Sequence, residues 1–319
     1  MGAAVAHASP APTAGVPWAL YAVPARGRPV ACVGHRTHAL ELVLHVHHFS
    51  VDVEEYFQVA ALGPAVPRAQ WCSYESRVAR SVDELLDLLE RHGSRGTFFV
   101  LGWIAQRDPQ LVRRIAAAGH EVASHGWDHR RVTDQEPHEF RDSVRRTRHL
   151  LEDITGTGVL GFRAPSFSIP RGLEWALDVL IEEGYRYDSS LYPIRRPGYG
   201  YANGARDPYW IDRPAGRLAE APPATVSLMG VRVPAGGGAY FRLLPYALVR
   251  SAFREAERRG VPATFYIHPW ELDAGQPRLD VSLATRIRHY GGLNGTRSRL
   301  ERLLTEFRFR TIAETVNEL

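Results

Sequence analysis

From residue 45 onward, short apolar runs alternate with longer amphipathic stretches. A stripe of apolar side chains at i, i+3, i+4 and i+7 begins at Val82 and predicts a helix that ends at Gly93, with Ser81 and Glu84 as its capping box. Further helices are predicted around Leu111 and at about 134–154, 171–183, 246–259 and 296–306. Strands are predicted at 96–102 and 120–124 and within GVLGFR, YRYDSS, ATFYIH and FRFRTI.

This alternation of strand and helix predicts an α/β fold with parallel strands joined by crossover helices. Seven or so such units without a break favour a closed or nearly closed barrel, with functional side chains at the carboxyl ends of the strands. Residues 1–44 are rich in Ala, Pro and Gly and show no periodicity, so we expect an unstructured or artefactual extension there. Residues 45–319 are expected to form one domain.

The composition removes several function classes. The chain contains 39 arginines and no lysine, which excludes enzymes that need a Schiff-base, pyridoxal-phosphate or P-loop lysine. The arginines are interspersed with acidic residues along predicted helices, so nucleic-acid binding is not expected. No apolar run approaches the roughly 20 residues of a membrane span, and no positive charge precedes Arg26. We therefore expect a cytoplasmic protein, whereas the pattern predicts no oligomeric state.

An acidic strand end, SVDVEE, carries the first candidate chemistry. Residues two apart in a strand point to the same side, so Asp52 and Glu54 should face together while Glu55 faces away. Two buried carboxylates repel each other unless a cation or a proton lies between them. The alternative is that the strand ends in solvent and both are ordinary surface groups.

Other polar side chains follow later predicted strands. His125 and His129, four residues apart, would project from one face of a helical turn, as two imidazole ligands of one metal do. The same spacing also occurs in surface pairs, but with a nearby carboxylate it matches a recurrent catalytic zinc site. His268 at the end of ATFYIH could act as a general acid, and Arg163 could orient Asp52. Asp188 ends another strand.

Five stretches of the chain together resemble a known family. They are HHFSVDVEEYFQV, GHEVASHGWDHR, GFRAPSFSI, YRYDSSLYP and FYIHPWELD. From about residue 45 to the end, the chain resembles NodB-type polysaccharide deacetylases, of the branch found with bacterial exopolysaccharide and exosortase gene clusters. The resemblance implies a distorted, incomplete (β/α)7-type barrel. It also implies hydrolysis of N-acetyl groups from a sugar polymer, such as an N-acetylglucosamine-containing exopolysaccharide, with a divalent metal, most simply Zn²⁺.

The resemblance also implies a role for each candidate residue. Asp52 would be the catalytic base, oriented by Arg163, and His268 the acid; Asp188 would join the catalytic set. Glu54, His125 and His129 would bind the metal. Trp127, Pro165, Tyr192 and Trp270 would contact the sugar, and a backbone N–H near Leu191 or Tyr192 would stabilise the oxyanion.

Two departures from the family pattern leave questions open. Many members carry adjacent aspartates, whereas here Val53 separates Asp52 from Glu54, so the metal ligand could be Glu54 or Glu55. The tryptophan usual near Asp188 is missing. Two other functions stay open on the sequence: hydrolysis of the C–N bond of a small cyclic amide or imide, or carbohydrate binding by a pseudoenzyme.

Overall fold

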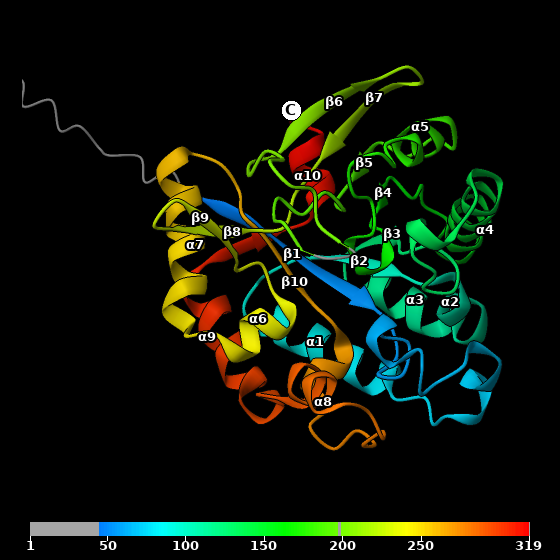
Figure 1. Ribbon diagram of the computed structural model, residues 1–319, viewed down its shortest axis with the longest axis horizontal. Helices are drawn as coiled ribbons and strands as arrows, with labels where there is room; N and C mark the ends of the chain where they lie inside the picture. Colours follow the sequence, from blue (N-terminus) through cyan, green and yellow to red (C-terminus); the bar gives the residue numbers. More distant parts are fainter. Residues whose placement is uncertain (1–44, 197–198, 319) are drawn as a thin grey trace, which may run out of the picture. The chain divides into compact units, whose positions relative to one another are not determined.

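The strand β1, which leads into the acidic run, pairs with β10 on one side and with β2 and β11 on the other (Figure 1). The structure is a computed structural model and describes residues 45–196 and 199–318, so the expectation for residues 1–44 lies outside the described residues. The strands are β1 (Val46–Val53), β2 (Thr97–Val100), β3 (Glu121–Ser124), β4 (Gly161–Phe162), β5 (Tyr187–Asp188), β6 (Tyr209–Arg213), β7 (Gly216–Glu220), β8 (Thr225–Leu228), β9 (Val231–Pro234), β10 (Thr264–Ile267) and β11 (Arg308–Arg310).

The main sheet has the order β10-β1-β2-β3-β4-β5-β7-β6, and β11 pairs with the first half of β1. Every neighbouring pair in this order is parallel except the antiparallel hairpin of β6 and β7. Single parallel bridges, Pro223 to Thr264 and Gly237 to Tyr266, connect the segment after β7 to β10. The predicted distorted, incomplete (β/α) barrel is therefore confirmed.

Gly237 shows why this closure needs a glycine. Its φ is 153°, and a Cβ at this position would lie 1.7 Å from the carbonyl oxygen of Tyr266. Only a residue without a side chain can bring the backbone this close to β10. The bridge carries the segment that follows it, α6, to the end of the barrel where β10 finishes.

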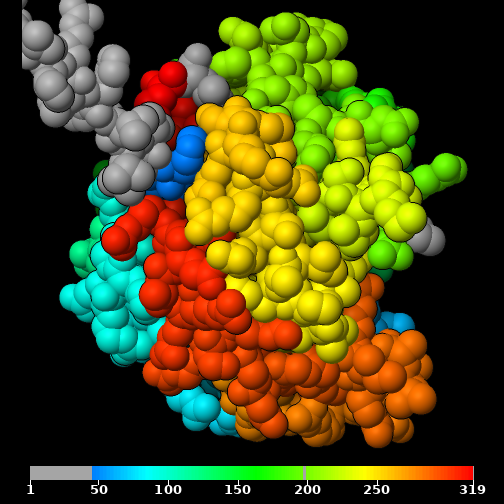
Figure 2. Space-filling model, turned by 90° about the vertical axis from the view of Figure 1, so that its left-hand side faces the viewer, coloured from blue at the N-terminus to red at the C-terminus, as the bar shows by residue number. Residues whose placement is uncertain are grey.

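Ten α-helices among the described residues cover the sheet. They are α1 (Val78–Arg91), α2 (Gly102–Arg107), α3 (Pro109–Ala117), α4 (Pro137–Thr155), α5 (Trp175–Glu182), α6 (Gly238–Leu243), α7 (Tyr246–Arg259), α8 (Leu283–Tyr290), α9 (Thr296–Glu306) and α10 (Ile312–Val316). Figure 2 shows α7 and α9 side by side on one face, where the ion pair of Arg250 and Glu306 joins them. No helix in the described part of the chain is both long and apolar enough to cross a bilayer.

The period-two prediction for β1 is confirmed. Phe49, Val51 and Val53 lie in the main apolar core, whereas Ser50 and Asp52 on the other face make polar contacts inside the barrel. Burial of three large apolar side chains on one face stabilises the strand by roughly 1.5–3 kcal/mol each. This contribution offsets the cost of placing polar groups on the opposite face.

The predicted capping box of the first helix is wrong. α1 begins at Val78, and Ser81 is buried inside it. The carboxylate of Glu55 instead accepts the backbone N–H of Arg77, at 3.0 Å, and the hydroxyl of Ser76, at 2.5 Å. A side chain more than twenty residues away therefore satisfies the helix terminus, which no local sequence signal could indicate.

Most predicted helices and strands are confirmed within a few residues, but two hairpins were missed. The hairpin of β6 with β7, the hairpin of β8 with β9, and the short helices α6, α8 and α10 had no clear periodicity of their own. Two of these elements, α6 and α8, contribute side chains to the pocket described below.

Candidate active site

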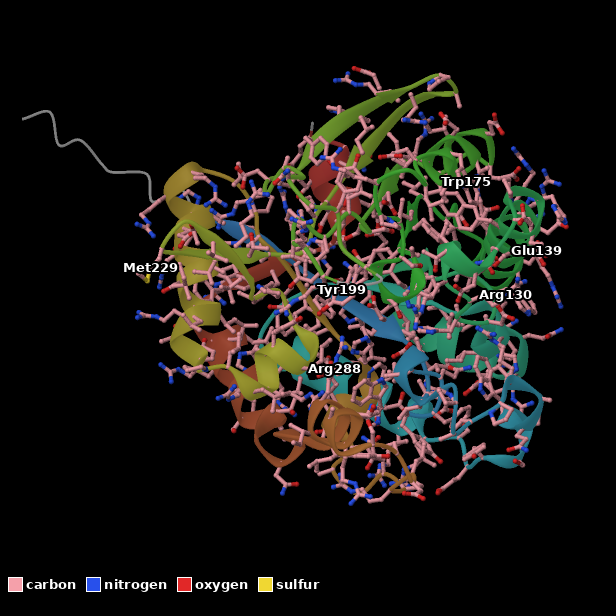
Figure 3. All side chains as sticks on the ribbon, in the orientation of Figure 1. Arg130, Glu139, Trp175, Tyr199, Met229 and Arg288 are labelled. Atoms are coloured by element: carbon pink, nitrogen blue, oxygen red, sulfur yellow. The ribbon has the colours of Figure 1, made fainter. Side chains whose placement is uncertain are left out.

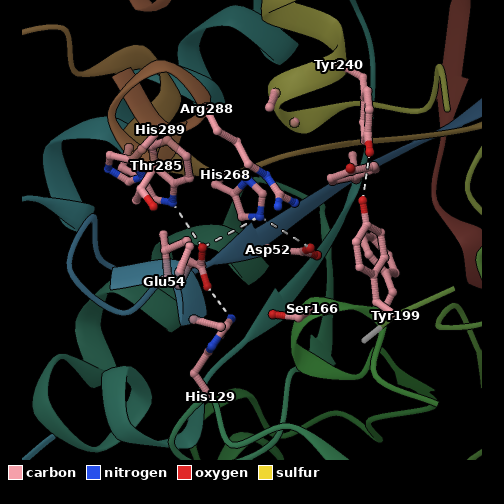
Figure 4. A pocket seen from close by; sticks show the side chains of 18 of the residues that line it. Asp52, Glu54, His129, Ser166, Tyr199, Tyr240, His268, Thr285, Arg288 and His289 are labelled. Atoms are coloured by element: carbon pink, nitrogen blue, oxygen red, sulfur yellow. Dashed lines mark hydrogen bonds and ion pairs between the residues drawn. The ribbon is translucent and has the colours of Figure 1, made fainter. Parts of the chain in front are cut away.

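A cavity of about 230 Å³ opens where β1, β3 and β10 end (Figure 4). Asp52, Glu54, His125, His129 and His268 all line it, although they come from three separate parts of the sequence. The remaining lining residues are Val59, Ala60, Ala61, Arg131, Ser166, Phe167, Tyr199, Gly238, Ala239, Tyr240, Arg242, Tyr266, Trp270, Thr285, Arg288 and His289. The structure thus brings together the predicted base, acid and metal ligands.

Asp52 is held by the fully buried Arg163. The Nη1 of Arg163 donates to Asp52 Oδ1 at 2.7 Å and to Ser50 Oγ at 2.8 Å. Its other nitrogens donate to the carbonyl and the hydroxyl of Ser189, at 3.2 and 2.8 Å, and the guanidinium stacks on Phe99. Because a guanidinium offers several donors in a fixed plane, these contacts fix the orientation of the Asp52 carboxylate.

Glu54, His125 and His129 place one candidate ligand atom each within 4.8 Å of one another. Glu54 Oε2 is buried and lies 2.6 Å from His129 Nε2, but this contact does not have the geometry of a hydrogen bond, and no other group of the described structure donates to this oxygen. His125 Nδ1 lies 2.8 Å from the carbonyl oxygen of Arg163, which can only accept, so Nδ1 carries the proton and Nε2 is left as a ligand. Two imidazoles and one carboxylate with an unsatisfied oxygen fit a divalent metal such as zinc.

The choice between Glu54 and Glu55 follows from these contacts. Glu55 points to the start of α1 and takes no part in the cluster, whereas Glu54 Oε1 accepts the indole N–H of Trp270 at 3.0 Å. Burial alone would raise the pKa of the Glu54 carboxyl, but the imidazoles of His129 and His268 outweigh burial and lower it. Burial lowers the pKa of His125 to about 4, so this imidazole is neutral and able to bind a cation at neutral pH.

His268 is positioned by two residues that the sequence reasoning missed. Its Nδ1 lies 2.8 Å from Glu271 Oε1, and Glu271 Oε2 accepts from Arg242 Nε at 2.5 Å. Arg242 also donates to the carbonyls of Gly291 and Arg288. Burial opposes protonation of His268, but the charges of Glu54, Glu271 and Asp52 raise its pKa to about 9.

This arrangement determines which nitrogen of His268 faces the pocket. Because the carboxylate of Glu271 can only accept, Nδ1 donates to it and Nε2 points toward the carboxylates of Asp52 and Glu54. The distances are 3.6 Å from Nε2 to Glu54 Oε1 and 3.9 Å from Nε2 to Asp52 Oδ2 (Figure 4). The motif HPWELD displays Glu271 three residues after His268, whereas nothing in the sequence points to Arg242.

The helical turn predicted to present His125 and His129 is wrong, although the two rings do meet, with their centroids 5.5 Å apart. Both residues lie in an irregular loop after β3. Gly126 and His129 have φ values of 74° and 58°, so both residues adopt left-handed backbone conformations. A left-handed non-glycine residue costs free energy, and the surrounding hydrogen bonds maintain this conformation.

Asp188 lies apart from the cavity lining. It is fully buried at the end of β5, where it accepts the hydroxyl of Ser190 at 2.5 Å. Ser190 Oγ in turn accepts the backbone N–H of Ala164, the residue that follows Arg163. Burial raises the pKa of Asp188 and of the adjacent Glu220. These contacts give Asp188 a supporting position behind the Arg163 loop, and its catalytic role stays a prediction.

The predicted oxyanion donors are already engaged. The N–H of Leu191 donates to Glu220 at 3.1 Å, and the N–H of Tyr192 donates to the carbonyl of Ser190 at 2.9 Å. Neither donor is therefore available to a substrate in this conformation. The oxyanion role of a backbone N–H near Leu191 or Tyr192 stays a prediction.

Of the four predicted sugar contacts, only Trp270 lines the cavity. Its ring lies between the imidazoles of His268 and His289, at 5.1 and 4.2 Å, so its faces are already covered. Tyr192 and Pro165 are buried, and Trp127 packs against Arg146 outside the cavity. The other aromatic residues that line the cavity are Phe167, Tyr199, Tyr240 and Tyr266. Of these, Tyr199 and Tyr240 are only partly buried, and sequence periodicity did not mark them.

Comparisons with known proteins bear on this site. Residues 67–187 match the family described as polysaccharide deacetylase, and residues 189–317 match a domain of unknown function, DUF3473. The chain is 28% identical over 170 residues to the peptidoglycan-N-acetylglucosamine deacetylase PgdA of Listeria monocytogenes, covering 48% of this chain and 35% of that protein. It is 43% identical over 102 residues to the chitooligosaccharide deacetylase of Bradyrhizobium sp. (strain ANU 289), covering 30% and 42%.

The fold also has a counterpart among solved structures. A protein of Mycobacterium smegmatis, proposed to be a polysaccharide deacetylase, superposes with a TM-score of 0.58 at 21% identity, over 86% of this chain and 89% of that chain. The present chain spans less than half of the length of the two sequence relatives named above. The two matched segments meet in one barrel, because His125 and Arg163 lie in the first and His268 in the second. Residues 67–187 are thus similar to polysaccharide deacetylases, and the DUF3473 segment supplies the rest of the barrel that follows β5, including part of the pocket.

Proposed function

We propose that this protein hydrolyses N-acetyl groups of an N-acetylated sugar polymer, releasing acetate and leaving a free amine, with Zn²⁺ as the metal. One observation carries the proposal: a single cavity holds a carboxylate and two imidazoles as ligands, beside a second carboxylate and a third imidazole. The names of the sequence relatives, which act on peptidoglycan and chitooligosaccharides, support this substrate class. An N-acetylglucosamine-containing exopolysaccharide is the substrate that we favour.

The fit of the ligand set determines what the metal would contribute. Glu54, His125 and His129 would hold the metal. A bound cation would also compensate the buried Glu54 Oε2, which accepts no hydrogen bond. When bound there, a divalent cation would acidify a water molecule and polarise the amide carbonyl. The other steps belong to side chains of the chain itself.

In this proposal Asp52 takes the proton of the attacking water. Arg163 occupies its Oδ1, so Oδ2, which faces His268, is the oxygen left to accept that proton. His268 carries a proton on Nε2, the nitrogen that faces the cavity, and would deliver it to the departing amine. Glu271 keeps the Nδ1 proton in place throughout. General acid and base catalysis of this kind contributes about 10²- to 10⁴-fold each.

The proposal is tested by measuring metal content and acetate release together. We expect about one zinc per chain by elemental analysis and acetate release from N-acetylglucosamine oligomers. His129→Ala should lower both, while His138→Ala, which replaces an exposed histidine at the start of α4, should lower neither. A zinc-loaded protein that releases no acetate from any N-acetylated oligomer, yet hydrolyses a cyclic imide, would overturn the proposal.

A further inference from the structure

Two arginines of the cavity wall have no acidic partner. Arg131 follows the metal-ligand loop, and Arg288 lies in the last turn of α8; both line the cavity. Among residues 45–196 and 199–318, no carboxylate oxygen lies within 4.0 Å of either guanidinium, and neither side chain donates a hydrogen bond. Asp52, by contrast, pairs with Arg163, and Glu54 belongs to the set of candidate metal ligands. The inner charges of the site are therefore matched, and the two outer cations are not.

Arg288 stands beside a pair of hydroxyl groups. Its guanidinium carbon is 5.9 Å from the ring of Tyr199, whose hydroxyl lies 2.7 Å from that of Tyr240 (Figures 3 and 4). Arg196 approaches the ring of Tyr240 at the same distance. Figure 4 shows the Arg288 side chain extending from α8 to the neighbourhood of His268. This wall presents a cation and two hydroxyl groups close to the reacting groups, and hydroxyl groups can donate to an anionic oxygen.

Arg131 lies where the cavity adjoins a second hollow. Val59, Ala60, His129 and Arg131 line both, and the second hollow continues along Phe57 and Pro67. A polymer lying across the reacting groups would thus pass Arg131 on its way from one hollow to the next. The second hollow also contains Arg68, which pairs with Asp128, and Asp134, so Arg131 is its unmatched cation among the described residues.

We propose that the polymer on which this site acts carries carboxylates on the sugars next to the N-acetylated one, and that Arg288 and Arg131 bind them. An uncharged polymer would partly desolvate both guanidinium groups without offering an acceptor of matching charge, which is unfavourable. A uronate carboxylate can accept two parallel hydrogen bonds from the planar guanidinium of an arginine. This inference rests on the proposed function and narrows its substrate class to acidic N-acetylated polymers.

The test compares two ligands that differ only in charge. One is a hexasaccharide of alternating glucuronate and N-acetylglucosamine, and the other is the same hexasaccharide after reduction of its carboxyl groups to alcohols. Binding is measured by calorimetry on the zinc-loaded Asp52→Asn variant, so that turnover does not interfere. We expect the acidic ligand to bind at least about fivefold more tightly, and this difference to shrink as ionic strength rises.

Arginine variants then localise the effect. Arg288→Gln and Arg131→Gln should each weaken binding of the acidic ligand about two- to fivefold and leave the reduced ligand unchanged. Arg286→Gln is the matched control, because Arg286 is an exposed arginine of α8 that does not line the cavity. Equal binding of the two ligands, or an equal loss in Arg286→Gln and Arg288→Gln, would overturn the inference.

Acetate release keeps this inference separate from the proposed function. It is measured in parallel, with Asp52 intact, on both hexasaccharides and on an uncharged N-acetylglucosamine hexamer. Release from the hexamer alone, together with equal binding of the two hexasaccharides, would support the deacetylase proposal and overturn the acidic substrate. Charge-dependent binding with no acetate release from any of the three would support the anion site and overturn the deacetylase proposal.

Discussion

Glu271→Gln tests how the DUF3473 segment supports the chemistry of the barrel. Glu271 is fully buried between Arg242 and His268, and the glutamine keeps its size while removing its charge. A glutamine can offer its oxygen to only one of the two donors, so the other must face an NH₂ group. The substitution therefore leaves either a buried guanidinium or the Nδ1 proton of His268 without an acceptor.

The expected loss of stability follows from the same contacts. Burial acts to raise the pKa of Glu271, but Arg242 and His268 outweigh it and lower the pKa from 4.5 to about 2. At about 1.4 kcal/mol per tenfold change in affinity for the proton, this is equivalent to about 3 kcal/mol. Breaking a buried ion pair by removing one partner costs about 3–5 kcal/mol, which agrees. We expect Glu271→Gln to lower the free energy of unfolding by about 3 kcal/mol.

Two measurements separate stability from positioning. Urea unfolding reports the free energy, and acetate release under conditions where the variant is folded should show a loss in kcat of about tenfold or more with little change in KM. The double variant Glu271→Gln with Arg242→Met should recover part of the stability, because no buried guanidinium remains, but none of the activity.

Glu301→Gln serves as the surface control. Glu301 forms an exposed i, i+4 pair with Arg297, and its loss should cost only about 0.3–0.5 kcal/mol. The reasoning fails if Glu271→Gln is no less stable than Glu301→Gln, or if its kcat equals that of the unaltered protein.

Three further predictions concern the base, the metal and acid stability. Asp52→Asn should reduce acetate release at least about 10²-fold. Its circular dichroism spectrum and unfolding midpoint should stay unchanged, because an amide oxygen can still accept the hydrogen bond from Arg163. Retained activity would exclude Asp52 as the base. Treatment with a chelator should abolish acetate release, and zinc should restore it to the unaltered protein but not to His125→Ala. Burial lowers the pKa of His47 to about 4 and that of His48 to about 3. The unfolded chain therefore takes up these protons near pH 6.5, and the stability contributed by the neutral imidazoles is complete above pH 6.5 and lost as the pH falls toward 4 and then 3. Urea unfolding between pH 7.5 and 5.5 should show that the free energy of unfolding falls with pH, approaching about 1.4 kcal/mol per pH unit for each imidazole well below pH 6.5. The variant His48→Gln cannot titrate at this position, so its free energy of unfolding should depend less steeply on pH. An unchanged slope in that variant would contradict this assignment.

Local sequence patterns predicted the fold class and the core of the candidate site. The period of two in β1 places Asp52 beside Glu54 and turns Glu55 away, and this follows from strand geometry alone. Strand ends in a parallel barrel meet at one edge, which is why the sequence was enough to group His125 and His268 with them. These inferences depend only on backbone geometry that every strand shares.

The tertiary structure decided the features that depend on contacts between distant segments. The sequence could not indicate that Glu55 caps α1, that Arg242 anchors Glu271, or that Arg288 and Tyr199 share a wall of the cavity. Each contact joins residues separated by 22 to 89 positions, so near neighbours along the chain carry no trace of it. Periodicity reports which side of a strand or helix is buried, because that depends on those near neighbours. Which side chains meet across the barrel depends instead on the packing of all the elements together, so those pairings appear only in the folded chain.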